Sequence, residues 1–179
     1  MKTLFDHIEL INDNKARSMS FFCKNDIVSI DSQTIDLLIQ ESRKHQSCDV
    51  RISLHKSPEE TFHNMIILQN KGNYYRPHKH TNKEETYHII NGKMIAFIFN
   101  DHGEILQFDA LSSTDKLMYR IPKNTWHVSY PLSQFVVFHE SKPGPFIGQK
   151  ETIFANWAPD GTNLKNAKQY IEKLMLVLK

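Results

Sequence analysis

The chain has 179 residues, enough for a domain with a substantial core, and 40% of them are hydrophobic. Lys and Arg number 22 against 20 Asp and Glu, and this near balance gives no support for binding nucleic acid or an anionic membrane surface. Acidic residues interrupt residues 1–19, and no apolar run approaches the roughly 18 residues that span a bilayer, so we expect neither a signal peptide nor a membrane helix. Cys23 and Cys48 are expected to be free thiols, which favours a cytoplasmic protein.

The N-terminal part is predicted to contain two short strands and one helix. Apolar runs at residues 9–11 and 27–30 are the strand candidates, and a turn is expected at 12–14. Asp31 or the following serine can cap a helix that ends near residues 44–46. The helix is expected to bury one apolar stripe, formed by Ile35, Leu38 and Ile39.

From residue 51 the pattern is typical of short β-strands separated by turns. The apolar runs 87–90 and 94–99 are joined by Asn91-Gly92, the strongest short indication of a hairpin. Such a series predicts a sandwich or a small closed barrel. Other strands are expected at residues 65–68, 105–108, 117–121, 126–130 and 135–138.

The C-terminal part differs, because a loop at 157–161 precedes apolar residues at helical spacing. This second helix is expected to pack on the barrel or on a second subunit. With no repeat or linker, we expect one domain over the whole chain. Its expected parts are a strand and helix segment at 1–47, a barrel core at about 50–145, and a loop and helix at 146–179.

The residues with the clearest chemistry are His78, His80, Glu85 and His127. Two histidines one residue apart project from the same face of a strand, where a carboxylate and a third histidine from other strands can meet them. Three imidazoles and one carboxylate suit Fe(II), Mn(II), Ni(II), Co(II) or Zn(II). An octahedral ion would keep two open positions for substrate, whereas tetrahedral zinc would close the site and be structural.

The spacing of these residues resembles the first motif of the cupin superfamily. The fixed positions are Gly72-x5-His78-x-His80-x4-Glu85-x6-Gly92. The resemblance implies a mainly β cupin fold, a small antiparallel β-barrel or jelly roll, here with an N-terminal and a C-terminal helix. It also implies that His78, His80, Glu85 and His127 are the metal ligands.

The second cupin motif is represented by Pro122-x-Asn124-x-x-His127, with altered loop positions. Asn124 stands where cupins usually have glycine, and asparagine tolerates the left-handed conformation that such a turn needs. Lys116 and Pro131 replace the opening glycine and the closing asparagine of the motif. These positions shape loops, so the ligand assignment stands.

Residues 31–161 also resemble the WbuC-type cupin metalloproteins. The resemblance is carried by the helix from Asp31, by the segments 75–80, 143–145 and 154–159, and by Arg51 with His55. That family is associated with bacterial surface-polysaccharide gene clusters. The resemblance therefore implies a sugar-like small-molecule substrate.

Five further residues are candidates for catalysis or substrate binding, each with a plainer alternative. Tyr87 could donate to a substrate oxygen or fill the barrel, and His55, which matches the WbuC-type pattern, could be an acid–base or a structural histidine. The same resemblance suggests Glu140, rather than its neighbour, as an inward-facing acid. Arg76 could clamp an anion or form a rim ion pair, and Trp126 is expected to pack, with substrate stacking as the alternative.

These features predict a metal-dependent enzyme acting on a sugar or sugar-derived intermediate of surface-polysaccharide synthesis. Isomerisation or epimerisation through an enediolate would use one divalent metal as a Lewis acid. An Fe(II)-dependent dioxygenase and a non-catalytic, metal-dependent sugar-binding module are the alternatives. The apolar face of the C-terminal helix also favours a homodimer.

Overall fold

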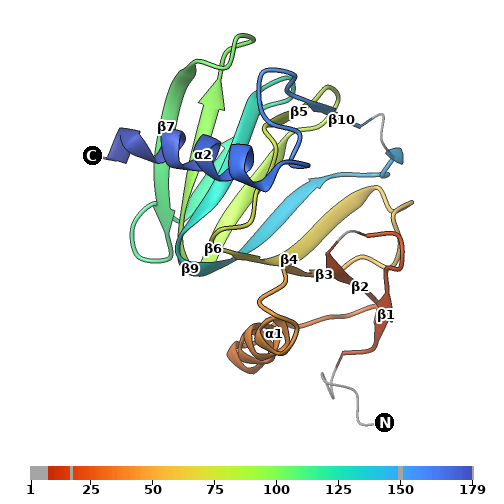
Figure 1. The fold of residues 1–179 in the computed structure, drawn as a ribbon. Helices are drawn as coiled ribbons and strands as arrows, with labels where there is room; N and C mark the ends of the chain where they lie inside the picture. The colour runs from red at the N-terminus through yellow and green to blue at the C-terminus, as the bar shows by residue number, and fades with distance from the viewer. Residues whose placement is uncertain (1–7, 17, 149–150, 179) are drawn as a thin grey trace.

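The computed structural model of the chain describes residues 8–16, 18–148 and 151–178. It is mainly β, with a helix near each end, as expected (Figure 1). Residues 1–7, which belong to the segment where no signal peptide is expected, lie outside the described residues.

The helices are α1 (Ser32–Lys44) and α2 (Leu164–Met175), and a 3-10 turn, η2 (Leu176–Leu178), follows α2. The strands are β1 (Leu10–Asn12), β2 (Met19–Cys23), β3 (Val50–Ser53), β4 (Phe62–Asn70), β5 (His78–His80), β6 (Glu85–Phe99), β7 (Ile105–Ser112), β8 (Met118–Ile121), β9 (Trp126–Pro143) and β10 (Thr152–Phe154).

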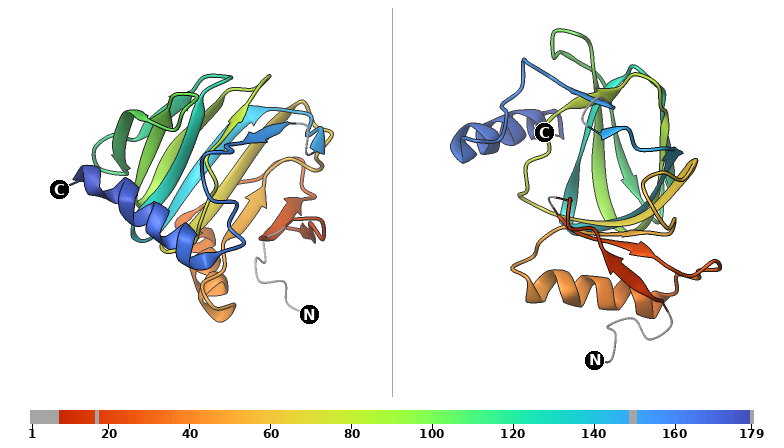
Figure 2. Two further views of the ribbon diagram at one scale, coloured as in Figure 1. Left: turned by 45° about the horizontal axis from the view of Figure 1, so that its top comes forward. Right: turned by 90° about the vertical axis from the view of Figure 1, so that its right-hand side faces the viewer.

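All ten strands belong to one curved sheet. Its main path runs β1-β2-β3-β4-β9-β5-β10, while β6 pairs with β7, β8 and β9. The pairs are antiparallel except β2–β3, which is parallel. The sheet is therefore mixed, whereas a purely antiparallel one was expected. The sheet curls around an interior, with α1 on its outside at one end and α2 across another outer face (Figure 2).

The Asn91-Gly92 hairpin prediction is wrong, because both residues lie inside β6. The pairing of β6 with β9 shifts between Ile89 and Asn91 and again between Gly92 and Met94, so Asn-Gly forms an irregularity in a continuous strand. Gly92 has φ +83°, and a Cβ there would approach the Phe135 backbone oxygen to 2.5 Å. Gly92 therefore does not form a turn. Its positive φ and missing side chain allow β6 and β9 to bend while they stay paired.

Two other expectations change in detail. Residues 27–30 are not a strand, and the N-terminal sheet is instead extended by β2, which pairs with both β1 and β3. The segments 126–130 and 135–138 are parts of the single strand β9. The helix at α1 is confirmed: Asp31 accepts a hydrogen bond of 2.8 Å from the Thr34 amide, and the predicted stripe is buried.

Three apolar clusters stabilise the sheet and hold the two helices against it. One lies between α1 and the outer face of the sheet and includes Leu38 and Ile52. A second fills the interior with residues such as Phe138 and Ile89. The third places Leu174 of α2 against Phe97, which confirms that the C-terminal helix packs on the barrel.

We expect Gly92→Ala to lower the free energy of unfolding by at least about 1 kcal/mol more than Gly72→Ala does. Both glycines have positive φ, so both substitutions strain the backbone, but a Cβ at position 72 meets nothing within 4 Å. Urea unfolding of the two variants measures the difference, and equal losses would contradict the close approach at position 92.

Candidate metal centre

Three strands bring the predicted ligands together at one end of the barrel. His78 and His80 lie on β5, Glu85 begins β6, and His127 follows the first residue of β9. One ligand atom from each residue lies within 4.8 Å of the others. The expected set is therefore assembled from residues that lie up to 49 positions apart in the sequence.

The alternation of β5 gives the two histidines a common face. Lys79 between them points elsewhere, since its Nζ lies 4.4 Å from the centre of a Trp126 ring and 3.6 Å from an Asp101 carboxylate oxygen. His78 is in register with His127 on β9, which places these two rings 4.4 Å apart between centroids. This register fixes the third histidine beside the first two.

The Asn124 turn holds the two motifs together. Asn124 has φ +60°, the left-handed conformation expected of it, and its amide donates a hydrogen bond of 2.7 Å to the His80 carbonyl. The second motif thus keeps its turn with asparagine in place of glycine.

Each histidine directs Nδ1 toward a backbone carbonyl. The distances are 3.1 Å from His78 to Arg76 O, 3.3 Å from His80 to Glu151 O, and 2.8 Å from His127 to Thr125 O. A proton on Nδ1 satisfies these carbonyls and leaves the Nε2 lone pair available. This arrangement of backbone acceptors is the one that orients metal-binding histidines in proteins.

Glu85 is 3% exposed and makes close contacts with two of the rings. Its oxygens lie 2.8 Å from His127 Nε2 and 3.4 Å from His80 Nε2. Burial favours a raised pKa for Glu85, but the contacts with His127 and His80 outweigh it, and the pKa lies well below 4.5. The carboxylate is therefore charged, as a metal ligand must be.

His78 and His127 differ in their preference for the charged form. Burial and the charge of His127 lower the pKa of His78 to about 3, so this ring is neutral near pH 7. Burial also favours a lower pKa for His127, but Glu85 outweighs it and raises the value. A bound cation would replace the proton that Glu85 favours on His127.

The residues fit a divalent cation. His127 is 2% exposed, and its Nε2 lies 2.8 Å from a Glu85 oxygen without making a well-aligned hydrogen bond among the described residues. An ion with bonds of about 2.0–2.2 Å holds its ligand atoms at separations close to those seen here. A cation at the centre would satisfy this nitrogen and the carboxylate together, and the partly exposed His78 marks the open side.

Tyr87 and Glu140 both face the interior, next to the candidate metal ligands. Tyr87 donates a hydrogen bond to Glu85 Oε1, and Glu140 is in register with Tyr87 across β6 and β9. Burial, followed by Glu85 and Glu140, raises the pKa of Tyr87 well above 10, so its hydroxyl stays protonated. His139, the neighbour of Glu140, lies on the opposite face and contacts Asn64.

Lys142 is a further residue at this site that the sequence reasoning missed. Its Nζ lies 2.9 Å from Glu140 Oε1, and its side chain is 17% exposed. Burial favours a lower pKa for Lys142, but Glu140 and Glu85 outweigh it and raise the value to about 12. The spacing Glu140-x-Lys142 could have indicated that Lys142 lies beside Glu140 in the interior, because alternate residues of a strand share a face.

The two expected substrate-binding residues have structural partners. Arg76 donates from Nε and Nη2 to the Ala155 carbonyl at 2.9 and 2.7 Å, and its guanidinium lies 5.8 Å from the centre of the Phe154 ring. Trp126 donates to Asp101 at 2.8 Å. Both side chains fix loops around the site, and their substrate contacts remain predictions.

His55 lies outside the metal-binding set. Its ring stacks on His63 at 4.1 Å and accepts a hydrogen bond of 3.2 Å from the Asn64 amide. Both histidines line a separate cavity, which Lys142 also lines. The acid–base role of His55 remains a prediction, and the stack gives it a structural role as well.

Comparisons with known proteins bear on the fold. A family model described as a domain of unknown function (DUF6016) matches residues 30–111, and no curated protein matches the sequence. The capsular polysaccharide assembling protein CapF from Staphylococcus aureus is similar in structure, with a TM-score of 0.50 and 20% identity over 58% of this chain and 31% of that one. A variant of Bacillus subtilis oxalate decarboxylase OxdC gives a TM-score of 0.47 and 16% identity, over 60% of this chain and 28% of that one.

This chain has a cupin fold. The cupin match covers less than a third of each of those longer proteins, so it concerns the barrel and not their whole activities. Within the cupin fold, the four-residue set stands as a candidate site for one divalent metal. Among the described residues, no helix is long and apolar enough to cross a membrane.

We expect His80→Ala to abolish stoichiometric metal binding while most of the barrel stays folded. The variant removes one of four ligands, and the three clusters that hold the fold do not include His80. Elemental analysis of purified protein and circular dichroism measure the two effects. His88→Ala is the matched control, because that histidine is exposed on β6. Unchanged metal content in the His80 variant would refute the ligand assignment.

Stability is expected to fall as the pH is lowered from about 6.5 to about 4. Burial, followed by the charge of His63, lowers the pKa of His55 to about 4. In that window the unfolded chain binds a proton at this position and the native protein does not, so stability decreases with falling pH. Allowing for solvent around this half-buried ring, the contribution is on the order of 1–2 kcal/mol.

Urea unfolding of metal-free protein at pH 7 and pH 5 measures this effect. His55→Gln should reduce the pH-dependent loss relative to the wild type, whereas His102→Gln, at an exposed position, should not. Identical pH dependence in the wild type and the His55 variant would contradict the assignment.

Proposed function

We propose that this protein is a metal-dependent enzyme that isomerises or epimerises a sugar or sugar-derived intermediate. The observation that carries the proposal is the set of His78, His80, Glu85 and His127, with Nδ1 of each ring held by a carbonyl. A bound divalent cation supplies Lewis acidity that polarises a substrate carbonyl. The partly exposed His78 provides the side from which a substrate can approach.

The remaining chemistry is assigned to Glu140, Lys142 and Tyr87. Isomerisation and epimerisation both require a base that removes a proton from the carbon next to a carbonyl, and an acid that returns it. Glu140 is the candidate base. Lys142 beside it can stabilise the negative charge that remains on the substrate when the proton is removed. Tyr87 keeps its proton and orients Glu85, so it serves as a positioning residue.

The biological setting is proposed from the resemblances. The WbuC-type pattern is associated with surface-polysaccharide gene clusters, and the structurally similar CapF is a capsular polysaccharide assembling protein. These support a substrate from bacterial surface-polysaccharide synthesis. A cytoplasmic location and a homodimer remain predictions that accompany this setting.

The test is exchange of substrate hydrogen with solvent. Metal-loaded protein is incubated in D2O with a panel of nucleotide-linked sugars, and proton NMR follows the loss of signal at carbon next to a carbonyl or hemiacetal. We expect exchange with at least one sugar, and we expect Glu140→Gln to slow it roughly 10²- to 10⁴-fold with metal content unchanged. Glu172→Gln, at an exposed position on α2, is the control.

The alternatives give different results in the same experiment. An Fe(II)-dependent dioxygenase would consume O2 in the presence of the sugar, without deuterium entering unreacted substrate. A non-catalytic sugar-binding module would bind a sugar and give neither exchange nor O2 uptake. Either result would overturn the isomerase proposal.

A further inference from the structure

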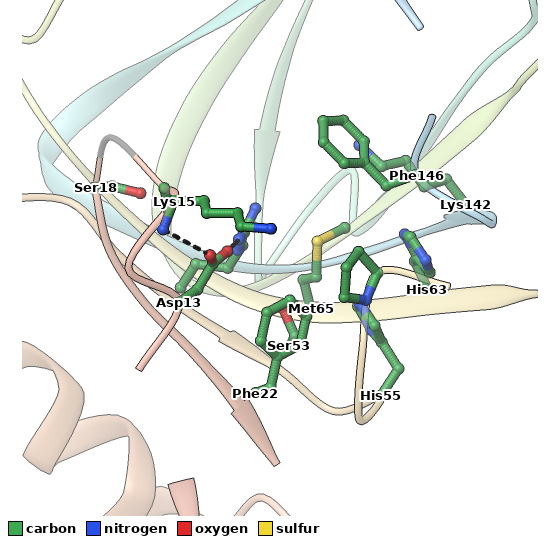
Figure 3. A pocket seen from close by; sticks show the side chains of 13 residues that line it. Asp13, Lys15, Ser18, Phe22, Ser53, His55, His63, Met65, Lys142 and Phe146 are labelled. Carbon is green, nitrogen blue, oxygen red and sulfur yellow. Dashed lines mark hydrogen bonds and ion pairs between the residues drawn. The ribbon is translucent and has the colours of Figure 1, made fainter. Parts of the chain in front are cut away.

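A cavity of about 270 Å³ lies on the inner face of the sheet, and its lining includes Lys142, which contacts Glu140. Figure 3 shows Asp13 and Lys15 on one side of it and His63 and Lys142 on the other, with Met65 between them. None of the four candidate metal ligands lines this cavity. Its residues have no role in the metal chemistry described above, except for Lys142.

The cavity and the metal centre share a wall. Glu140 on β9 is in register with Tyr87 on β6 and with Met65 on β4, which is in register with Ser53 on β3. Neighbouring strands lie about 4.8 Å apart, so this row leads from the metal centre to the cavity over roughly 10–15 Å. Lys142 contacts Glu140 and also lines the cavity. Glu140 and Lys142 therefore lie between the candidate metal centre and the cavity.

Three buried polar atoms in the cavity wall have no hydrogen-bond partner among the described residues. They are Arg51 Nε, Ser53 Oγ and His63 Nε2, and residues Ser53 and His63 are 1% and 3% exposed. Buried polar atoms in folded proteins are nearly always hydrogen-bonded. Three such atoms in the wall of one cavity indicate that a polar ligand belongs there.

The charges of the lining favour an anion. Lys15, Arg51 and Lys142 contribute three cations, against one carboxylate from Asp13. Asp13 pairs with Arg51 at 2.7 Å and Glu140 pairs with Lys142 at 2.9 Å, so these two carboxylates offset two of the three positive charges. Phosphate and carboxylate groups bind preferentially to guanidinium and ammonium groups.

Apolar rings complete the lining. Phe22 and Phe146 both face the cavity, together with the thioether of Met65 (Figure 3). Aromatic rings pack well against the C–H faces of sugars while cations bind their acidic groups. The lining therefore matches a molecule that has both a sugar ring and an acidic group better than it matches a free inorganic ion.

We propose that this cavity binds the phosphate or carboxylate group of an acidic sugar derivative, whose remaining part reaches the metal centre. The proposal rests on the proposed function for the identity of the sugar as a substrate, but anion binding in the cavity does not depend on catalysis. Arg51, Lys15 and Ser53 are assigned as donors to the anionic group.

Binding to metal-loaded protein is measured by titration calorimetry with four probes: glucose, glucuronate, glucose 1-phosphate and inorganic phosphate. We expect one or both acidic sugars to bind at least about 10-fold more tightly than glucose and more tightly than inorganic phosphate. Preference for glucose 1-phosphate or for glucuronate identifies the anionic group as phosphate or carboxylate. Equal binding of glucose and both acidic sugars would overturn the proposal.

Variants locate the binding. Lys15→Gln, and the pair Asp13→Asn with Arg51→Gln, should each weaken binding of the preferred acidic sugar by roughly 10- to 100-fold. Lys123→Gln, at an exposed position outside the lining, is the charge-matched control. Ser53→Ala removes a hydroxyl with no partner and should weaken binding without loss of stability. Unchanged affinity in all these variants would overturn the assignment.

His80→Ala separates this proposal from the proposed function. That variant lacks a metal ligand but keeps the whole lining, so it should still bind glucose 1-phosphate or glucuronate in preference to glucose. Preferential binding that persists without exchange activity supports the cavity even if the enzyme proposal fails. Loss of the preference in His80→Ala would place the anion at the metal and overturn the cavity proposal.

Discussion

A buried carboxylate is the constraint on which this structure depends. Glu85 is almost completely removed from water, and an unpaired charge in such a place costs several kcal/mol. His127, His80 and Tyr87 are its partners. Because His80 lies on β5 and His127 on β9, these strands cannot move away from β6 without removing two of the three partners. The interaction that prepares the candidate metal centre therefore also fixes the end of the barrel.

The bend in the two longest strands makes this meeting possible. His127 and Glu140 lie an odd number of residues apart on β9, so a regular strand would place them on opposite faces. The irregular pairing around Gly92 changes the alternation, and both side chains then face the interior. A local break in the sheet pattern is thus what puts the candidate base beside the candidate metal ligands.

Local features of the sequence predicted the structure well, and non-local ones did not. The cap at Asp31, the common face of His78 and His80, and the left-handed Asn124 each follow from a few neighbouring residues. The Asn91-Gly92 prediction failed because a glycine with positive φ suits a strand irregularity as well as a hairpin, and only pairing with β9 decides between them. The cavity beside β3 depends on which strands become neighbours, and no spacing within the sequence expresses that.

The position of Lys142 connects the two proposed halves of the site. Its ammonium group contacts the Glu140 carboxylate and also faces the neighbouring cavity. An oxyanion bound in that cavity would share this single ammonium with Glu140, because a lysine offers one charge to both. The bound acidic group and the Glu140 carboxylate would thus both contact Lys142, and this shared contact would connect the cavity to the candidate base at the metal centre.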